Sequence, residues 1–430
     1  MVLSRKSVLA VCLSAIVVFS LSFLSFAQQQ RTLEVWINQW SADATKWVQE
    51  NVVPAFEAKH PGVKVNISPE GSVEKLVLAT AGGIAPDIIF TGGTSLIALA
   101  PQGLLRPLNS YVEQWDEYEM FHPLAFANAW WEGNLYSIPQ TVELRMINYH
   151  KDLFNEAGLD PERPPQSWEE LEAAARRLTR ISGNQLEVRG YLWGWSNINA
   201  AQEFGGFLMQ NGGKLISDDS RKPLFNDALG LETLEFLFRM YEIAYPPGVA
   251  GPQPRAGLSA FSARQVAMLP GAPTIVQQVR DQAPEILGQA SAFVPRRSPN
   301  HEPVALAFIN GLGIPAGAQN PDLAFEFIEM LSTAEASKVF MRTGGFVSPR
   351  IDLAEWVQET LPEMVPWYMA LEYIRPWPQI PGAVAGYTTL GDEILKVLRR
   401  QIPPATALIL AEQAQANLFN DYWASIESGR

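Results

Sequence analysis

The chain is poor in the residues that most often bind metals. Cys12 is the only cysteine, and the four histidines lie far apart, without a His-Glu-x-x-His or other paired spacing. Cys12 falls in an N-terminal apolar run, so the rest of the chain can form neither a disulfide nor a thiolate metal site. Scattered histidines do not predict zinc. We therefore expect no metal and no cofactor, and a fold that its hydrophobic core stabilises.

Common nucleotide-binding and nucleophile motifs are also missing. There is no Gly-x-x-x-x-Gly-Lys-Ser/Thr phosphate loop and no Gly-x-Ser-x-Gly elbow, and the dinucleotide-like segment 311–316 has Pro315 where a helix should run. Paired carboxylates such as Glu169 and Glu170 could serve glycoside hydrolysis. They stand in the predicted first turn of a helix, however, where acidic side chains favour the helix dipole. The sequence thus favours a protein that is not an enzyme, with a secreted carbohydrate-active enzyme as the alternative.

Basic charge is scarce as well. The 32 Lys and Arg residues against 45 Asp and Glu residues give a formal net charge of −13. An acidic surface disfavours nucleic acid and anionic membranes as partners. It leaves a small neutral ligand open, and the 430 residues are enough for two domains with cores of their own.

The N-terminus has the layout of a secretory signal peptide. Arg5 and Lys6 precede an apolar run over residues 8–26, which ends at Ser25-Phe26-Ala27. This pattern predicts a signal peptide over residues 1–27 with cleavage after Ala27. An uncleaved anchor is the alternative, because the run approaches the roughly 20 residues that span a bilayer. We expect a periplasmic or secreted protein.

The first hundred residues predict a β-α-β arrangement. Apolar residues alternate over 33–37, continue at helical spacing over 43–56, and alternate again over 63–67, and a buried strand is expected at 88–90. Pro54 should bend or interrupt the helix, and Pro61-Gly62 should end it. Such a unit implies parallel strands beneath covering helices. Polar residues at the strand ends then face a common crevice.

Two later helices carry clear start signals. Ser167-Trp-Glu-Glu170 has the pattern of a capping box, and Asn320-Pro321 precedes an apolar stripe over residues 324–331. Stripes of this kind pack against a core, so neither helix predicts chemistry.

Aromatic and amide residues gather in segments that do not follow a helical or strand period. They are Trp36 to Trp40, Trp130-Trp131, Trp193 to Asn199, and Trp377. A pyranose has an apolar C–H face and a polar hydroxyl rim. A site for it therefore combines flat aromatic surfaces with amide, carboxylate or guanidinium groups. Any single tryptophan is at least as often a core residue.

Read in order, many short segments resemble the sugar-binding family of extracellular solute-binding proteins of ABC importers, which includes the maltodextrin-binding proteins. Ala85-Pro-Asp-Ile-Ile-Phe90, Gly133-Asn-Leu-Tyr-Ser-Ile-Pro139 and Asn320-Pro-Asp-Leu-Ala324 are examples. The others are 53–56, 60–65, 103–108, 148–154, 157–159, 165–171, 211–213, 261–268 and 311–315. Their order and spacing cover almost the whole chain after residue 27.

This resemblance implies an α/β fold of two hinged lobes, each a sheet flanked by helices, with the ligand in the cleft between them. It implies an N-terminal lobe of residues 28–139 and 304–331 and a C-terminal lobe of residues 140–303 and 332–430. The chain would cross between the lobes near 139–149, 295–303 and 331–336. The implied partners are a sugar ligand and the membrane permease of an ABC importer, and the implied state is a monomer.

The resemblance also implies a set of ligand-binding residues. Thr94 and Ser95 stand where maltodextrin binders have an acidic and a basic residue, and segment 271–274 lacks the family's tryptophan, so maltodextrin is disfavoured. Arg145 on the first crossing strand leaves open a charged glycoside or another anion as ligand. The full set is Asn38, Gln39, Trp40, Thr94, Ser95, Gln140, Glu143, Arg145, Trp195, Asn199, Glu203, Gly345 and Trp377.

Overall fold

The computed structural model describes residues 31–193, 196–249, 257–378 and 383–429. The predicted signal peptide and Trp195 lie outside these residues. Among the residues described, none of the helices combines the length and the apolar character needed to span a bilayer.

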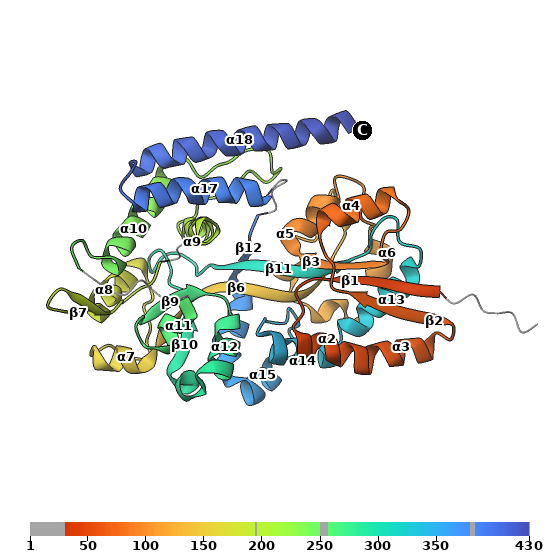
Figure 1. The fold of residues 1–430 in the computed structure, drawn as a ribbon, viewed down its shortest axis with the longest axis horizontal. Coiled ribbons are helices and arrows are strands. Elements are labelled where there is room, and N and C mark those ends of the chain that lie inside the picture. The colour runs from red at the N-terminus through yellow and green to blue at the C-terminus, as the bar shows by residue number, and fades with distance from the viewer. Residues whose placement is uncertain (1–30, 194–195, 250–256, 379–382, 430) are drawn as a thin grey trace, which may run out of the picture.

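One mixed sheet of eight strands runs through the molecule, which has two lobes (Figure 1). Its centre is the antiparallel pair of β6 (Ile138–His150) and β11 (Ala305–Gly313), which extend from one lobe to the other. In the N-terminal lobe, β3 (Ile88–Gly92) pairs with β11, β1 (Arg31–Ile37) pairs with β3, and β2 (Val63–Ser68) pairs with β1. In the C-terminal lobe, β9 (Met268–Gly271) and β10 (Ala290–Phe293) pair with β6, and β12 (Ile374–Pro376) pairs with β11. The predicted two-lobed α/β fold is confirmed.

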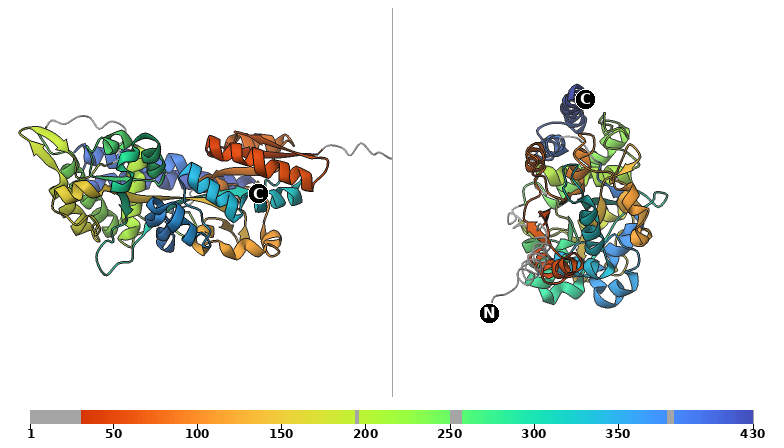
Figure 2. Two further views of the ribbon diagram at one scale, coloured as in Figure 1. Left: turned by 90° about the horizontal axis from the view of Figure 1, so that it is seen from below. Right: turned by 90° about the vertical axis from the view of Figure 1, so that its right-hand side faces the viewer.

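Helices cover this sheet in both lobes. Seen from below, the lobes lie at opposite ends of an elongated molecule (Figure 2). The helices of the N-terminal side are α2 (Ala42–Trp47), α3 (Val53–Lys59), α4 (Val73–Ala81), α5 (Gly93–Leu96), α6 (Asn109–Val112), α13 (Pro321–Leu331) and α14 (Ala334–Gly344). The remaining helices are α7 (Lys151–Glu156), α8 (Trp168–Leu178), α9 (Asn197–Gln210), α10 (Ala228–Ala244), α11 (Gly257–Ser262), α12 (Thr274–Gln282), α15 (Ala354–Thr360), α16 (Val365–Met369), α17 (Ala383–Leu398) and α18 (Pro404–Gly429). Two small hairpins are β4 (Trp130–Trp131) with β5 (Asn134–Leu135), and β7 (Arg180–Ser182) with β8 (Gln185–Val188).

The opening unit forms as its sequence predicts. Leu33, Val35 and Ile37 are buried along β1, which pairs in parallel with both β2 and β3. The helix between β1 and β2 is interrupted by a π-helical turn over Val48–Val52, which ends two residues before Pro54. Proline lacks the N–H of a regular helical turn, so the irregular turn stands where the sequence predicts an interruption.

Both predicted helix starts are also present. The Ser167 hydroxyl accepts a hydrogen bond from the backbone N–H of Glu170, and the Glu170 carboxylate accepts one from the backbone N–H of Gln166. Ser167 and Glu170 thus pair backbone N–H groups at the start of α8 that have no partner within the helix. Helix α13 begins at Pro321, and its apolar stripe is buried in the core of the N-terminal lobe.

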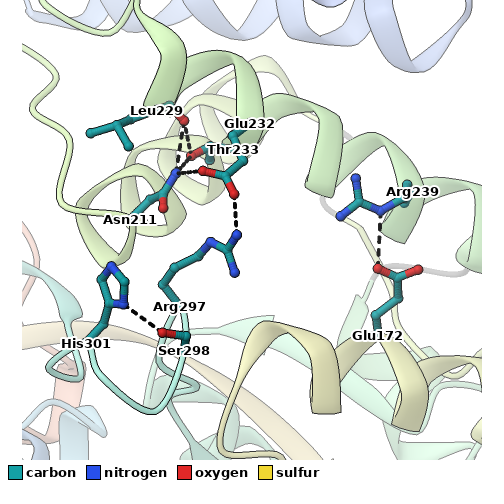
Figure 3. Close-up of polar contacts among 9 residues, drawn as sticks. All are labelled: Glu172, Asn211, Leu229, Glu232, Thr233, Arg239, Arg297, Ser298 and His301. Atoms are coloured by element: carbon teal, nitrogen blue, oxygen red, sulfur yellow. Dashed lines mark hydrogen bonds and ion pairs between the residues drawn. The ribbon is translucent and has the colours of Figure 1, made fainter.

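The segment 295–303, which leads into β11, is fastened to the C-terminal lobe (Figure 3). Arg297 forms an ion pair with Glu232 on α10, and Ser298 hydrogen-bonds His301 at 2.9 Å. The Asn211 amide also donates to Glu232, at 3.0 Å. The Arg296 N–H also donates to the Gln166 carbonyl, and the Arg296 carbonyl accepts from the Trp168 N–H, so the backbone of this segment is held at the start of α8.

Helix α14 packs with the N-terminal lobe. Ala336 and Phe340 belong to the same buried cluster as Val35 on β1 and Phe327 on α13. Beyond the helix, Val347 forms a β-bridge with Val142 at the centre of β6. Ala336 and Phe340 of α14 thus add to this core.

Candidate functional site

A cavity of about 300 Å³ opens in the C-terminal lobe between α9 and the strands β6, β9 and β11. Strand β6 brings Arg145 to this cavity, and α9 brings Asn199, Gln202 and Glu203. The apolar residues of its wall are Ile147, Leu192, Trp193, Phe207, Leu269, Ile275, Phe293 and Leu306. Three residues of the predicted ligand set, Arg145, Asn199 and Glu203, therefore lie around one hollow.

A polar network on β6 stands at this cavity. Arg145 donates to the Glu143 carboxylate at 2.6 Å and, through Nε, to the Gln202 amide oxygen at 3.2 Å. Residues two apart on a strand share a face, which is why Glu143 and Arg145 meet. The Arg145 guanidinium also lies 4.7 Å from the centre of the half-buried Phe308 ring. The pair is neutral overall and presents hydrogen-bonding groups beside a flat apolar ring.

Glu203 is held by a buried phenol. Tyr191 donates to the Glu203 carboxylate at 3.1 Å. Burial, and then the negative charge of Glu203, raise the pKa of Tyr191 well above 10, so the phenol keeps its proton. Tyr191 therefore orients this carboxylate on α9.

Trp193 brings a buried donor to the cavity wall. Its side chain is 1% exposed, and its indole N–H has no hydrogen-bond partner within the part of the chain that the structure describes. A buried N–H without a partner is costly, which makes each such group informative about function. Because this nitrogen has almost no accessible surface, a ligand acceptor could reach it only after neighbouring atoms moved.

The loop after β1 forms a separate group of predicted residues. The Trp40 indole donates to the Gln140 amide oxygen on β6 at 2.7 Å, while the amide nitrogen of Gln140 is buried without a partner among the described residues. The Asn38 amide donates to the Gly71 carbonyl at 3.4 Å, and Gln39 is exposed near Gly92 at the end of β3. These side chains thus lie at the strand ends of the N-terminal lobe, as the sequence predicts.

Five further predicted residues lie elsewhere or cannot be placed in full. Ser95 lies on α5, where the backbone of Thr94 is described but its side chain is not, and Trp195 lies outside the described residues. Gly345 ends α14 with φ of 66°, and a Cβ there would lie 2.9 Å from Gln277 on α12. The last, Trp377, is treated next.

Trp377 is part of the C-terminal lobe's core. It is 1% exposed and packs against Phe308 and Tyr387, with ring centroids at 5.6 and 4.3 Å. Its six-membered ring also lies close to the backbone of Gly205 on α9. The structure thus surrounds this indole with protein atoms, so a ligand could stack on it only after these neighbours moved.

The C-terminal helix forms a second contact between the lobes. Trp423 on α18 stacks on Trp131 of the N-terminal lobe, with ring centroids 6.0 Å apart and planes at 20°. The neighbouring Tyr422 hydroxyl donates to the Ala98 carbonyl at 3.4 Å, and the Arg221 guanidinium lies 4.5 Å from the Trp423 ring. In Figure 1 the C-terminal end of α18 reaches toward the N-terminal lobe. Tyr422 and Trp423 line a hollow of about 360 Å³ together with residues of both lobes.

Sequence reasoning missed several residues of the cavity. Gln202 lies next to the predicted Glu203, and Trp193 lies two residues from the predicted Trp195. Helical spacing offered a signal for Gln202, because residues 199, 202, 203 and 206 share one face of a helix. Phe207 and Leu306 carried no signal, since they read as ordinary core residues.

The chain is similar to known binding proteins. Residues 40–338 match the family model of the bacterial extracellular solute-binding protein. A binding protein of Brucella abortus (strain 2308) is 26% identical over 273 residues, which are 62% of this chain and 64% of that protein. The sn-glycerol-3-phosphate-binding periplasmic protein UgpB of Escherichia coli (strain K12) is 25% identical over 193 residues, which are 43% of each chain.

Solved structures resemble the chain in fold. The sugar-binding protein MalE from Xanthomonas citri has a TM-score of 0.79 and 21% identity, covering 92% of this chain and 99% of that one. A solute-binding protein from Thermotoga lettingae bound with alpha-D-tagatose has a TM-score of 0.73 and 24% identity, covering 90% of this chain and all of that one. The two lobes, the crossing strands and the family match over most of the chain agree, and the chain belongs to the family of bacterial extracellular solute-binding proteins.

Proposed function

We propose that this protein is the substrate-binding component of an ABC importer, and that it captures a sugar or small oligosaccharide between its lobes and delivers it to the membrane permease. The observation that carries the proposal is the network of Glu143, Arg145 and Gln202 beside the Phe308 ring. A neutral set of donors and acceptors matches the hydroxyl rim of a pyranose, and the apolar cavity wall, which includes Trp193 and Phe207, matches its C–H face. It stands on β6, the strand that runs between the lobes.

The two lobes would close around the bound sugar. Residues 28–139 and 304–331 form the proposed N-terminal lobe, and we extend it through Gly344 because α14 packs with its core. Residues 140–303 and those after Gly344 form the C-terminal lobe. Sugar bound to both lobes would favour the closed state in proportion to its differential affinity for that state, and the permease would recognise this state.

The wider ligand set is part of the same proposal. Asn38, Gln39, Trp40 and Gln140 would contact sugar from the N-terminal side, and Asn199 and Glu203 from the C-terminal side. Thr94, Ser95, Trp195, Gly345 and Trp377 remain candidates, with Trp377 requiring movement of its neighbours.

The protein would bind without catalysis. The two cleft carboxylates already have partners, since Glu143 accepts from Arg145 and Glu203 accepts from Tyr191. Catalysis of glycoside hydrolysis needs one protonated and one ionised carboxyl group across the bond. We infer a monomeric protein. We place it in the periplasm or outside the cell, because the UgpB relative is named as periplasmic.

Calorimetric titration of the protein with a panel of mono- and oligosaccharides tests this function. We expect saturable binding of at least one sugar, and a loss of about tenfold or more in Arg145→Ala, because a hydrogen bond to a charged group is worth about 1.5–3 kcal/mol. Arg180→Ala is the matched control, since Arg180, on the hairpin of β7 and β8, forms an exposed ion pair with Glu156 at the end of α7. No binding across the panel, or equal losses in both variants, would contradict the proposal.

An anionic ligand is the second candidate, and two observations favour it. Arg145 reaches the cavity, and a relative is named for binding sn-glycerol-3-phosphate. The Glu143 carboxylate opposes this candidate because it already neutralises Arg145. Titration with glycerol-3-phosphate against glycerol separates the two: preference for the phosphate would support an anion, and Glu143→Gln should then strengthen binding.

A further inference from the structure

We propose that Glu143, Gln202 and Phe308 make the site selective for neutral ligands, because they hold Arg145 so that it offers a ligand a single nitrogen, Nη2, and no two-donor edge. This inference rests on the proposed function and narrows its ligand to an uncharged polyol such as a neutral sugar. It follows from which guanidinium nitrogens of Arg145 already have partners.

Both edges of the Arg145 guanidinium are partly used within the protein. A guanidinium binds a carboxylate or phosphate through two parallel N–H groups on one edge, which is either Nε with Nη2 or Nη1 with Nη2. In Arg145, Nε donates to the Gln202 amide oxygen at 3.2 Å, and Nη1 donates to the Glu143 carboxylate at 2.6 Å. Each edge has therefore lost one of its two donors.

The remaining nitrogen is the one that a ligand can use. Among the residues that the structure describes, none accepts a hydrogen bond from Nη2 of Arg145. The side chain is 27% exposed and lines the cavity. A ligand could gain a second donor only by displacing Gln202 or Glu143.

Phe308 holds the plane of the guanidinium. The Arg145 guanidinium carbon lies 4.7 Å from the centre of the Phe308 ring, a distance at which the ring quadrupole attracts a cation. Phe308 stacks in turn on Trp377, with centroids 5.6 Å apart, and Trp377 is 1% exposed. Because this ring rests on the core, it opposes a rotation of Arg145 that would expose a complete edge.

The charges beside Nη2 also favour a neutral ligand. Glu143 forms an ion pair with Arg145, and its own side chain is 26% exposed, so its carboxylate repels an anion that approaches the same guanidinium. A hydroxyl group can accept from Nη2 and donate its own proton to a nearby oxygen. An ionised carboxylate only accepts, so it gains one hydrogen bond where a hydroxyl gains two.

The test compares matched neutral and anionic compounds by calorimetric titration of the full chain. The pairs are D-glucose with D-glucuronate, D-galactose with D-galacturonate, and glycerol with sn-glycerol-3-phosphate. In every pair that binds, we expect the wild type to bind the anion at least about tenfold more weakly, which is the size of one hydrogen bond to a charged group.

Variants separate the free edge from the charge. Gln202→Ala frees the edge of Nε and Nη2 without changing the charge, and it should raise anion affinity about tenfold relative to the neutral partner. Adding Glu143→Gln, which removes the charge but keeps an acceptor oxygen, should raise it further. Arg145→Lys in this double variant should abolish the gain, because lysine has no two-donor edge. Glu50→Gln is the matched control, since it removes the same charge from an exposed pair with Lys46.

Phe308→Leu tests the ring. It keeps an apolar side chain, and it should reduce the preference for the neutral compound about threefold, whereas a purely structural role would weaken both members of a pair equally. A wild type that prefers the anion, no gain of anion binding in the double variant, or an equal gain in Glu50→Gln would overturn the selectivity inference alone. Absence of binding by every sugar would overturn the proposed function, while a gain of anion binding in the double variant would still support the assigned role of Arg145.

Discussion

Adjacent glycines on α9 predict opposite effects of the same substitution. Gly205 faces the core of the C-terminal lobe, where an added Cβ would lie 2.5 Å from the Trp377 ring and 2.8 Å from the Leu215 side chain. Gly206 faces the cavity, where the nearest atom would be 3.6 Å away. We therefore compare Gly205→Ala with Gly206→Ala.

The packing around Trp377 sets the size of the difference. Trp377 is 1% exposed and lies against Phe308 and Tyr387, so its ring has little room to move. Overpacking a core of this kind costs about 1–3 kcal/mol, while alanine in place of glycine inside a helix gains about 0.5–1 kcal/mol. Gly205→Ala should lose about 0.5–2 kcal/mol of stability, and Gly206→Ala should gain up to about 1 kcal/mol.

Urea unfolding followed by tryptophan fluorescence measures both variants against the wild type. The midpoint should fall for Gly205→Ala and should rise or stay constant for Gly206→Ala. Near-ultraviolet circular dichroism should change only in the first variant, because only there does an indole have to shift. Equal midpoints for the two variants would refute the packing that we describe around Trp377.

Three further predictions concern the contact between lobes, acid stability and helix capping. The Trp131 ring stacks on Trp423 between the lobes, so Trp131→Ala should lower the free energy of unfolding by about 0.5–1.5 kcal/mol more than the loss of buried apolar area alone. The same variant should increase the radius of gyration of the free protein in X-ray scattering. Hydrogen bonds from Asn211 and then Arg297 lower the pKa of Glu232 below 4.5, so its contribution is present above that pH and is lost as pH falls through the folded-state pKa. Glu232→Gln should thus reduce the loss of unfolding free energy between pH 5 and pH 3, measured by urea unfolding, by the few tenths of a kcal/mol typical of exposed pairs. Ser167→Ala should cost about 1 kcal/mol in urea unfolding, and no change would contradict the capping bond.

Local patterns in the sequence predicted local structure well. The alternation at Leu33, Val35 and Ile37, the interruption before Pro54 and the cap at Ser167 each depend on residues close together in the chain. Their physical causes are the pleat of a strand, the missing N–H of proline and the unpaired N–H groups of a helix start. Such causes need no knowledge of the tertiary fold.

The site was predicted less completely because its properties depend on distant neighbours. A tryptophan side chain can stack on a sugar ring, yet Phe308 and Tyr387 pack against the indole of Trp377. Trp193 gains its interest from an N–H that no described residue accepts, which no sequence pattern records. Arg145 was identified correctly as a residue of the crossing strand, but its pairing with Gln202 joins elements that are 57 residues apart.

The central claim is that the protein binds a sugar reversibly and returns it unchanged. The most direct measurement is titration of the full chain with the sugar panel, followed by release of the bound sugar in denaturant and its identification by NMR. The account predicts saturable one-to-one binding of at least one sugar and recovery of that sugar intact. Recovery of a cleaved or modified product, or no binding by any sugar, would contradict it.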